Sequence, residues 1–387
     1  MHIGIDGRPL QEKSGGVKEI ALAMLRALWS VDTVNRYHIF FNASGGIALP
    51  DLSRHSNISI SRSRWPNKLL NLSTALLGFP KTDRLANKGA SDSFDAFFMP
   101  NLNFAALHPQ MKLILVVHDL SFRHFPDFYS LKRQLWHRAI HYEKLIRRAN
   151  HLLAVSESTK QDIMSSLNIP EEKITVIPPL LTLETPGDYD QTVLARHRLS
   201  PGYLLFLGTL EPRKNIESLL EAYALLLEKN IPSLPDLVIA GPVGWRTKSI
   251  FQLAKKIHSK RIRFLHYIAP GDKPAIYRNA SVFVFPSFYE GIGLPPMEAA
   301  SLGTPVIAST TSSLSEMLGD AALFVNPWSV SELAAGIELL CLHPELRAKL
   351  TKAGRERMRR FTAEKTGGAL LRLLGEVRTM PSYANRH

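Results

Sequence analysis

Short apolar runs alternate along the chain with longer segments whose apolar residues recur at helical spacing. The apolar runs lie at residues 2–6, 37–41, 57–61, 94–99, 112–117, 151–155, 174–177, 203–207, 236–240, 261–265, 281–285, 305–308 and 322–325. The helical patterns between them include 17–29, 131–148, 216–229, 248–257, 296–302 and 330–342. Because the runs are apolar throughout, both faces of each strand should be covered. The pattern therefore predicts an α/β protein built on doubly wound parallel sheets.

The alternation is interrupted once, between residues 178 and 201. This segment holds several prolines, a glycine and no sustained apolar period, which is typical of a connection between domains. We therefore predict one domain over 1–185 and a second over 200–362, which suits a chain of 387 residues. A ligand should then bind in the crevice between them, at the carboxyl ends of the strands.

The composition is that of an ordinary globular protein, with 45% hydrophobic and 21% charged residues. Its apolar runs fall short of the roughly 18 residues that span a bilayer, so we expect no transmembrane helix. The N-terminal segment lacks the pattern of a signal peptide. A single cysteine, Cys341, excludes an intrachain disulfide framework, and its apolar surroundings predict a core thiol in a reducing, cytoplasmic compartment.

The chain is strongly basic, with a formal net charge of +13. Residues 1–180 carry 22 basic and 15 acidic residues, and the remainder carries 25 and 19, so both halves contribute. A basic excess indicates partners that carry phosphate, namely a nucleotide, an anionic lipid or a nucleic acid. Charge alone does not choose among these three.

The richest motif lies at residues 281–309, where a buried strand leads through a glycine loop into a helix. Glu290 lies in the loop and Glu298 in the first part of the helix, with seven residues between them. Helix N-termini bind anions through their amides and dipole. The loop positions expected to hold a diphosphate are Gly291, Ile292, Gly293 and Leu294. The two carboxylates would accept hydrogen bonds from sugar hydroxyls.

A second motif at 203–223 joins a strand to a helix through Gly208 and a polar turn. Arg213 and Lys214 in that turn could neutralise the charge that develops on a departing diphosphate without a metal ion. A solvated turn is the alternative.

Two weaker motifs follow strands of the first half. Gly15 and Gly16 open a helix after the first strand and would let backbone approach a phosphate, although the GxGxxG fingerprint of dinucleotide oxidoreductases is absent. His118 and Asp119 end another strand, where crevice residues belong. Ser156 and Ser158 are expected to act first as helix caps.

Together these blocks resemble the E-x7-E motif of the retaining glycosyltransferase family 4, which has the GT-B fold of two Rossmann-like domains facing a deep cleft. The resemblance implies that Glu290 binds the donor hexose and Glu298 binds the ribose. It also implies that Arg213 and Lys214 hold the diphosphate. Many family members carry an arginine directly after the glycine at position 208, where this chain has Thr209.

Further site assignments follow only from the resemblance. It puts His118 near the reacting centre, Gly15 and Gly16 near the donor phosphate, and the segment at Tyr267 and Ile268 against the base. It implies a helix over 363–387 that crosses back to the first domain. It also implies a front-face route in which the leaving diphosphate helps to remove the acceptor proton.

The motif sequences HDLSF, GTLEPRKN and EGIGLPPMEA most resemble those of bacterial mannosyltransferases of surface-polysaccharide assembly. That likeness implies a GDP-mannose donor, a lipid-linked or oligosaccharide acceptor, and neither cofactor nor metal. Residues 61–81 and 130–150 mix basic and apolar residues like amphipathic helices, which would suit contact with the anionic inner face of the cell membrane. Core-packed helices with solvated charges are the alternative.

Three other functions are alternatives to transfer onto a lipid-linked acceptor. A GT-B phosphorylase or sugar synthase would act on a free sugar, and an inactive module would bind a sugar nucleotide without transfer. A nucleic-acid-binding protein would explain the charge, but its signatures are absent and the basic residues are dispersed. The sequence Asp188-Tyr189-Asp190 resembles a metal-binding DxD motif, yet it lies in the predicted connection and is expected to be solvated.

Overall fold

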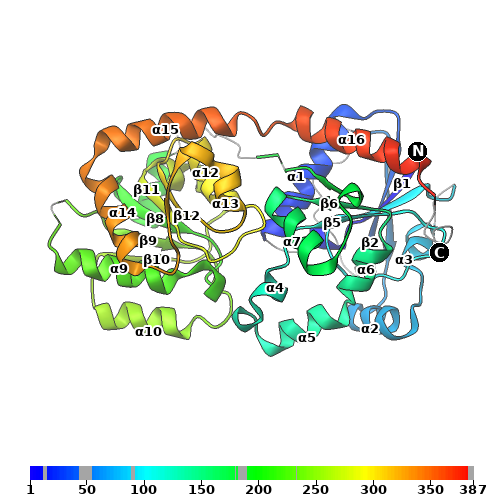
Figure 1. Ribbon diagram of the computed structural model, residues 1–387, viewed down its shortest axis with the longest axis horizontal. Coiled ribbons are helices and arrows are strands. Elements are labelled where there is room, and N and C mark those ends of the chain that lie inside the picture. The colour runs from blue at the N-terminus through cyan, green and yellow to red at the C-terminus, as the bar shows by residue number, and fades with distance from the viewer. Residues whose placement is uncertain are drawn as a thin grey trace. The chain divides into compact units, whose positions relative to one another are not determined.

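The structure is a computed structural model, and it describes residues 1–11, 15–42, 55–88, 92–178, 180–181, 190–231 and 233–381. The chain forms two compact units, each around its own sheet (Figure 1). Unit 1 comprises Met1–Leu120, Leu131–Leu180 and Phe361–His387, and unit 2 comprises Ser121–Ser130 and Leu181–Arg360.

Unit 1 contains a seven-stranded sheet in the order β3-β2-β1-β4-β5-β6-β7. Its strands are β1 (His2–Asp6), β2 (Arg36–Asn42), β3 (Ile58–Ser63), β4 (Ala96–Met99), β5 (Leu113–Val117), β6 (His151–Ala154) and β7 (Ile174–Val176). All neighbouring pairs are parallel. Parallel strands require crossover connections, so all their carboxyl ends meet at one edge of the sheet.

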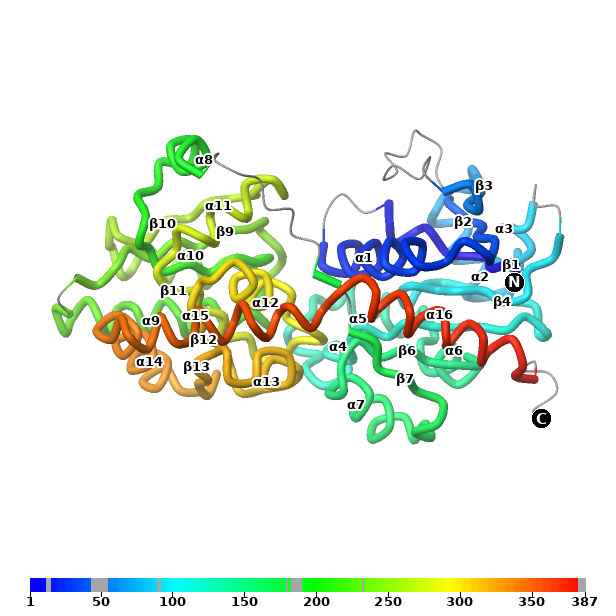
Figure 2. The backbone as a smooth tube through the Cα atoms, turned by 90° about the horizontal axis from the view of Figure 1, so that it is seen from above, coloured from blue at the N-terminus to red at the C-terminus, as the bar shows by residue number. Residues whose placement is uncertain are grey.

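Helices cover both faces of this sheet. They are α1 (Gly16–Val31), α2 (Asn67–Leu77), α3 (Thr82–Ala86), α5 (Leu131–Ala139), α6 (Tyr142–Arg148), α7 (Glu157–Leu167) and α16 (Ala363–Thr379), with short 3-10 helices at Arg8–Gln11 and Glu171–Lys173. The C-terminal helix α16 lies beside α1 (Figures 1 and 2). The two pack so closely that a Cβ at Gly367 would lie 2.0 Å from the carbonyl oxygen of Ala27.

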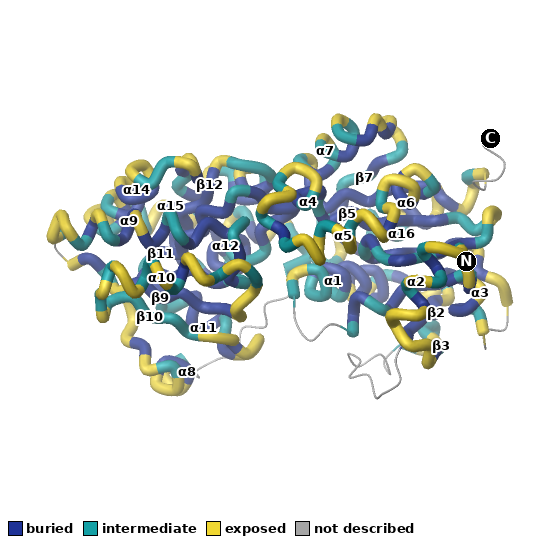
Figure 3. The backbone as a smooth tube through the Cα atoms, turned by 90° about the horizontal axis from the view of Figure 1, so that it is seen from below, coloured by how far each residue is buried: buried dark blue, intermediate teal, exposed yellow. Residues whose placement is uncertain are grey.

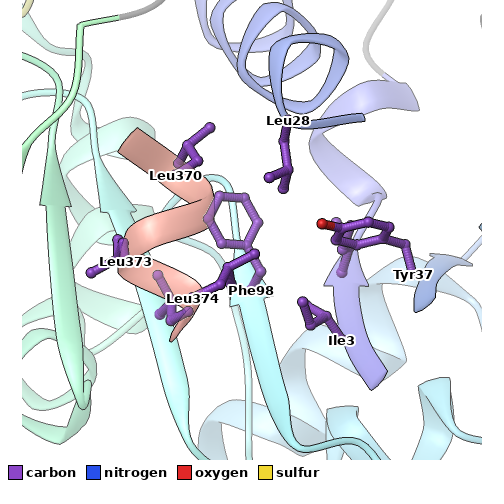
Figure 4. A pocket seen from close by; sticks show the side chains of 9 residues that line it. Ile3, Leu28, Tyr37, Phe98, Leu370, Leu373 and Leu374 are labelled. Atoms are coloured by element: carbon purple, nitrogen blue, oxygen red, sulfur yellow. The ribbon is translucent and has the colours of Figure 1, made fainter. Parts of the chain in front are cut away.

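A small apolar cavity of about 10 Å³ remains beneath α16 (Figure 4). It is lined by Ile3, Ile5, Leu28, Tyr37, Phe98, Ile114, Leu370, Leu373 and Leu374. This volume leaves room for about one water molecule, and an apolar wall offers water no hydrogen bonds. The cavity is therefore a packing gap and not a ligand site.

Unit 2 contains a six-stranded parallel sheet in the order β10-β9-β8-β11-β12-β13. Its strands are β8 (Tyr203–Leu207), β9 (Leu237–Ala240), β10 (Ile262–Leu265), β11 (Ala280–Phe285), β12 (Val306–Ser309) and β13 (Ala322–Val325). Its helices are α4 (Ser121–His124), α8 (Asp190–His197), α9 (Ile216–Glu228), α10 (Lys248–Ile257), α11 (Lys273–Arg278), α12 (Leu294–Ser301), α13 (Ser313–Leu318), α14 (Val330–Leu342) and α15 (Pro344–Met358). Short 3-10 helices lie at Pro126–Phe128, Pro212–Lys214, Pro270–Asp272 and Gly319–Ala321. The inner strands form the buried centre of each unit, whereas the edge strands β3 and β10 are mostly half-buried or exposed (Figure 3).

Every predicted apolar run is a strand among the described residues, so the doubly wound parallel architecture is confirmed. Two helix predictions were wrong. Residues 131–148 form α5 and α6 rather than one helix, because His141 adopts a left-handed conformation with φ of 54°. Residues 61–81 are helical only over α2, since β3 takes the first residues of that segment. The thiol of Cys341 is half-buried on α14 rather than a full core residue.

The predicted connection over 178–201 contains helix α8, which the apolar pattern did not reveal. Arg278 Nε donates to Asp190 Oδ2 at 2.9 Å, and Arg196 pairs with Asp272 at 2.8 Å. Asp190 is therefore paired with a cation of α11, so its prediction as a solvated linker residue was wrong. Asp188 and Tyr189 lie outside the described residues.

Candidate functional site

Three residues predicted from separate motifs come together in unit 2. Arg213 and Lys214 lie in the turn after β8, and Glu290 lies in the loop after β11, which is the neighbouring strand. Lys214 Nζ lies 2.5 Å from Glu290 Oε1, and Arg213 Nη1 lies 2.9 Å from Glu290 Oε2. The side chains of Lys214 and Glu290 are 9% and 7% exposed. The two motifs thus build one buried cluster of charges.

The loop that carries Glu290 is held by its backbone. Arg213 Nη1 donates to the carbonyl oxygen of Tyr289 at 2.5 Å, and the amide of Phe288 donates to the carbonyl oxygen of Arg213 at 2.9 Å. The amide of Glu290 donates to Ser312 Oγ at 2.8 Å. These bonds fix the loop against two neighbouring turns, so Glu290 is placed before any ligand arrives.

Glu211 and Asn215 belong to this cluster although sequence reasoning missed them. Glu211 Oε1 accepts from Arg213 Nη2 at 2.8 Å and sets its orientation. Asn215 is buried with a φ of 57°, and its amide donates to the carbonyl oxygens of Pro286 and Pro327 at 3.1 and 2.7 Å. The available signal was their position beside the basic pair in the segment EPRKN.

Electrostatics keep Glu290 ionised at neutral pH. Burial alone would raise the pKa of Glu290, but the positive charges of Arg213 and Lys214 lower it to about 2. Burial lowers the pKa of Lys214, and the charge of Glu290 opposes that shift. Buried charges are tolerated when they are paired, and this pairing meets that condition. The two cations can therefore bind another anion in place of the Glu290 carboxylate.

Glu298 lies on α12 and has its own partners. Tyr277 donates its hydroxyl to Glu298 Oε2 at 2.7 Å, and Lys273 Nζ lies 3.8 Å from Glu298 Oε1. The helix begins after Gly293, whose φ is 80° and whose Cβ would lie 2.3 Å from a methyl carbon of Leu314. That position therefore requires glycine. The intervening loop residues Gly291 and Ile292 are buried, and Leu294 is half-buried at the first helical position.

Two further predicted positions line the carboxyl edge of the same sheet. Gly208 follows β8, and its carbonyl oxygen would lie 2.0 Å from a Cβ at Gly241, which shows how closely these two turns approach. Ile268 follows β10 and is buried, whereas its neighbour Tyr267 is exposed. A buried isoleucine beside an exposed tyrosine ring forms a surface against which a nucleotide base could stack.

In unit 1, His118 directly follows β5 and is 8% exposed. Its Nε2 lies 2.8 Å from the carbonyl oxygen of Pro100, which can only accept, so Nε2 carries the proton. The Nδ1 atom is buried and has no hydrogen-bond partner among the residues described. Burial lowers the pKa of His118, which favours the neutral ring. Its Nδ1 is therefore an acceptor that a ligand hydroxyl could satisfy.

Gly15 and Gly16 also belong to unit 1. Gly15 caps α1 with a φ of 147°, which favours glycine, whereas a Cβ at Gly16 would meet nothing within 4 Å. Sequence reasoning missed Asp6 and Arg8, which follow β1. Arg8 Nη2 lies 2.8 Å from Asp6 Oδ2 and also donates to the carbonyl oxygen of Phe104 at 2.9 Å. An acidic residue at a buried strand end was the signal for this pair.

The remaining candidates have modest roles. Ser156 Oγ accepts from the amide of Thr159 at 3.1 Å, so its prediction as a helix cap is confirmed, and Ser158 lies in the first turn of α7. Asp119 is half-buried beside His118. Over the part of the chain that the structure describes, no group of three or more His, Cys, Asp or Glu residues could hold a metal ion.

Known proteins are similar to this chain in sequence and in fold. The family profile "Glycosyltransferase Family 4" matches residues 16–185, and the profile "Glycosyl transferases group 1" matches residues 195–357. O-antigen chain mannosyltransferase B of Escherichia coli is 30% identical over 346 residues, which cover 85% of this chain and 87% of that protein.

Solved structures agree with the architecture. Sucrose-phosphate synthase of Thermosynechococcus elongatus superposes with a TM-score of 0.75 at 20% identity, covering 97% of this chain and 99% of that one. Anabaena HepE, solved in complex with UDP and glucose, gives a TM-score of 0.71 at 16% identity, covering 97% and 100%. With two parallel-sheet units and this match along both, the chain belongs to glycosyltransferase family 4 and has the GT-B fold.

Proposed function

We propose that this glycosyltransferase is a retaining, metal-independent hexosyltransferase that moves mannose from GDP-mannose to a lipid-linked or polysaccharide acceptor. The observation that carries the proposal is the buried cluster of Arg213, Lys214 and Glu290. Two fixed cations can stabilise a departing diphosphate, a task that many transferases give to a metal ion. The choice of mannose is supported by the mannosyltransferase that shares 30% of its sequence with this chain.

The cluster suggests how the donor would bind. Without a ligand, both cations are satisfied by Glu290. A diphosphate would take over Arg213 and Lys214, which releases the Glu290 carboxylate to accept hydrogen bonds from hydroxyls of the sugar. Amides of the loop over 291–294 would add to the binding of the diphosphate. Donor binding would thus exchange the carboxylate for the diphosphate at both cations, and sugar hydroxyls would hold the Glu290 carboxylate by hydrogen bonds.

Other residues would bind the ends of the donor. Glu298, oriented by Tyr277, would accept hydrogen bonds from the ribose. The backbone at Ile268 would contact the base, Gly15, Gly16 and Gly208 would leave room for the phosphates, and Nδ1 of His118 would accept from a sugar hydroxyl.

The transfer step then follows from these assignments. The bond between the anomeric carbon and the diphosphate oxygen breaks, and Arg213 and Lys214 stabilise the charge left on that oxygen. The acceptor hydroxyl attacks from the face that the diphosphate leaves, and its proton passes to the leaving phosphate. Exclusion of bulk water strengthens these electrostatic contacts.

Unit 1 supports a peripheral contact with an anionic membrane. Large apolar side chains that are 40–77% exposed gather on two of its segments, at Trp65, Leu69, Leu72, Leu76, Leu77, Phe79, Leu131, Leu135 and Trp136. The same segments carry Arg62, Arg64, Lys68, Lys81, Lys132, Arg133 and Arg138, and Glu143 is the one acidic residue in the sequence of 61–81 and 130–150. Exposed apolar residues mixed with cations fit the interface of an anionic bilayer. None of the described helices has the length and hydrophobicity to cross a bilayer.

A binding and transfer experiment tests the donor side. Thermal shifts would be measured with GDP, UDP, ADP and their sugars, with and without EDTA, followed by mannose transfer to lipid-linked and free saccharides. We expect stabilisation by GDP and GDP-mannose that EDTA does not change, and transfer to the lipid-linked acceptor. Loss of binding in EDTA would contradict metal independence. Transfer to a free sugar alone would instead indicate a synthase.

A further inference from the structure

The segment Ser121–Ser130, called the strap below, leaves unit 1 after Leu120 and returns to it at Leu131. The strap makes its contacts with residues of unit 2 and is grouped with that unit. Trp245 Nε1 donates to the carbonyl oxygen of Phe128 at 2.7 Å, and the guanidinium of Arg246 donates to the carbonyl oxygen of Asp127. Two side chains of unit 2 thus hold the backbone of the strap.

Aromatic rings of the strap stack on the two residues that precede Glu290. The ring of Phe128 lies 5.3 Å from that of Phe288 at 23°, and the ring of His124 lies 5.8 Å from that of Tyr289 at 29°. Phe125 also meets Tyr289 at 5.9 Å. Offset stacks at these distances are favourable beyond the area that they bury. The strap therefore covers one side of the donor loop.

The same two loop residues are also hydrogen-bonded to Arg213. The amide of Phe288 donates to Arg213, and Arg213 donates to the carbonyl oxygen of Tyr289. The loop is thus held between a charged turn and an aromatic strap, and Glu290 follows directly. Loss of the strap contacts should therefore increase the mobility of the backbone at Glu290.

We propose that the strap is a positioning element of transfer, with Phe128 and Trp245 holding the donor loop in the geometry in which Glu290 meets the sugar. This inference rests on the proposed function, since it assigns the loop to the donor. The strap follows His118 and Asp119 closely in the sequence, after the end of β5 in unit 1. Its rings stack on the two residues that precede Glu290 in unit 2. One ten-residue segment therefore connects the candidate residues of the two units.

The test compares Phe128→Ala and Trp245→Phe with a control, Phe264→Ala. The control removes a ring from a similar pair in unit 2, Phe251 and Phe264 at 5.1 Å, that does not touch the loop. Amide exchange is measured at Phe288 and Glu290, whose amides are bonded to Arg213 and Ser312. We expect about tenfold faster exchange in Phe128→Ala and no change in the control. Trp245→Phe keeps an aromatic ring but loses the indole N–H that donates to the carbonyl oxygen of Phe128. It therefore tests the strap even if Phe128→Ala fails to fold.

Transfer provides the second measurement. Both strap variants should lower kcat about tenfold with donor KM within about twofold of the wild type, because the cations that bind the diphosphate remain. The double variant Phe128→Ala with Phe288→Ala should lose little more than the worse single variant, since both act on one loop. Unchanged exchange in both strap variants, or additive losses in the double variant, would overturn the positioning role. Exchange needs no substrate, so a wild-type protein without transfer would contradict the proposed function and leave the exchange result valid.

Discussion

The two units prepare their candidate residues in opposite ways. In unit 2, Arg213, Lys214 and Glu290 already satisfy one another in a buried cluster. In unit 1, His118 has a buried ring nitrogen without a partner in the described residues, and α2 and α5 leave apolar side chains exposed. A diphosphate leaving group is stabilised best by charges that are already fixed in place. The contrast therefore supports the proposal that unit 2 binds the donor diphosphate and that unit 1 binds the acceptor.

The largest expected effect removes the cluster. Lys214→Ala and Glu290→Gln should each lower transfer about 10²–10³-fold, which is the usual loss when one electrostatic contact to the transition state is removed. The matched control is Lys229→Ala, because Lys229 pairs with Glu338 at 2.9 Å on the exposed surface of the same unit. Rates of mannose transfer, with circular dichroism to check folding, decide the outcome. Full activity in both site variants would refute the cluster as the donor site.

A smaller effect is expected from His118→Ala. The loss of one neutral acceptor should lower kcat/KM about 10–100-fold, while the affinity for free GDP stays the same because the diphosphate cations lie in unit 2. Titration calorimetry with GDP and initial rates with GDP-mannose measure the two quantities. If GDP affinity fell together with kcat/KM, the division of labour between the units would be wrong.

The double variant Leu76→Glu with Leu77→Glu tests whether the exposed apolar side chains of α2 bind a membrane. Burial of two leucines is worth roughly 3 kcal/mol, so binding to vesicles of phosphatidylglycerol and phosphatidylcholine should weaken by about 100-fold. The control is Leu342→Glu, an exposed leucine of unit 2. Vesicle sedimentation measures binding, with phosphatidylcholine vesicles alone as the uncharged surface. Equal binding of the double variant and wild type would exclude α2 as a docking surface.

The smallest effect concerns acid stability. Burial lowers the pKa of His2, His38, His118 and His137 in unit 1, with His137 at about 4. The unfolded chain takes up these protons below its ordinary value of 6.5, so unit 1 should lose stability as the pH falls from about 6.5 toward 4. The lowered pKa of Glu290, about 2, contributes stability to unit 2 that is lost only below about 4.5.

Amide exchange at pH 7, 5.5 and 4.5 resolves the two units. Strands of unit 1 should lose protection at a milder pH than those of unit 2. The variant His137→Phe should reduce this difference, because it removes a half-buried group that gains a proton on unfolding. Simultaneous loss of protection in both units would contradict the assignment.

The inner strands were predictable because strands covered on both faces are largely apolar, and each of the thirteen runs forms a strand, including the more polar edge strands β3 and β10. The break between α5 and α6 was not, since the apolar period continues across Ile140 and the left-handed residue His141 leaves no hydrophobic signal. Helix α8 was hidden by the prolines and glycine around it and is stabilised by pairs such as Arg278 with Asp190.

The candidate site divides along the same line. Arg213, Lys214 and Glu290 lay in motifs whose residue types already indicate phosphate and sugar chemistry, and the structure brings them together. Asn215 and the strap act through contacts with residues more than 70 positions away in the chain, such as Pro286 and Phe288. Sequence spacing carries no record of such contacts, so only the structure reveals them.

The most direct test of the account is a structure of the protein with a bound nucleoside diphosphate, preferably GDP. We predict that Lys214 Nζ and the guanidinium of Arg213 bind phosphate oxygens, and that the 2.5 Å contact between Lys214 and Glu290 opens. A nucleotide bound elsewhere, with that contact unchanged, would contradict the central claim.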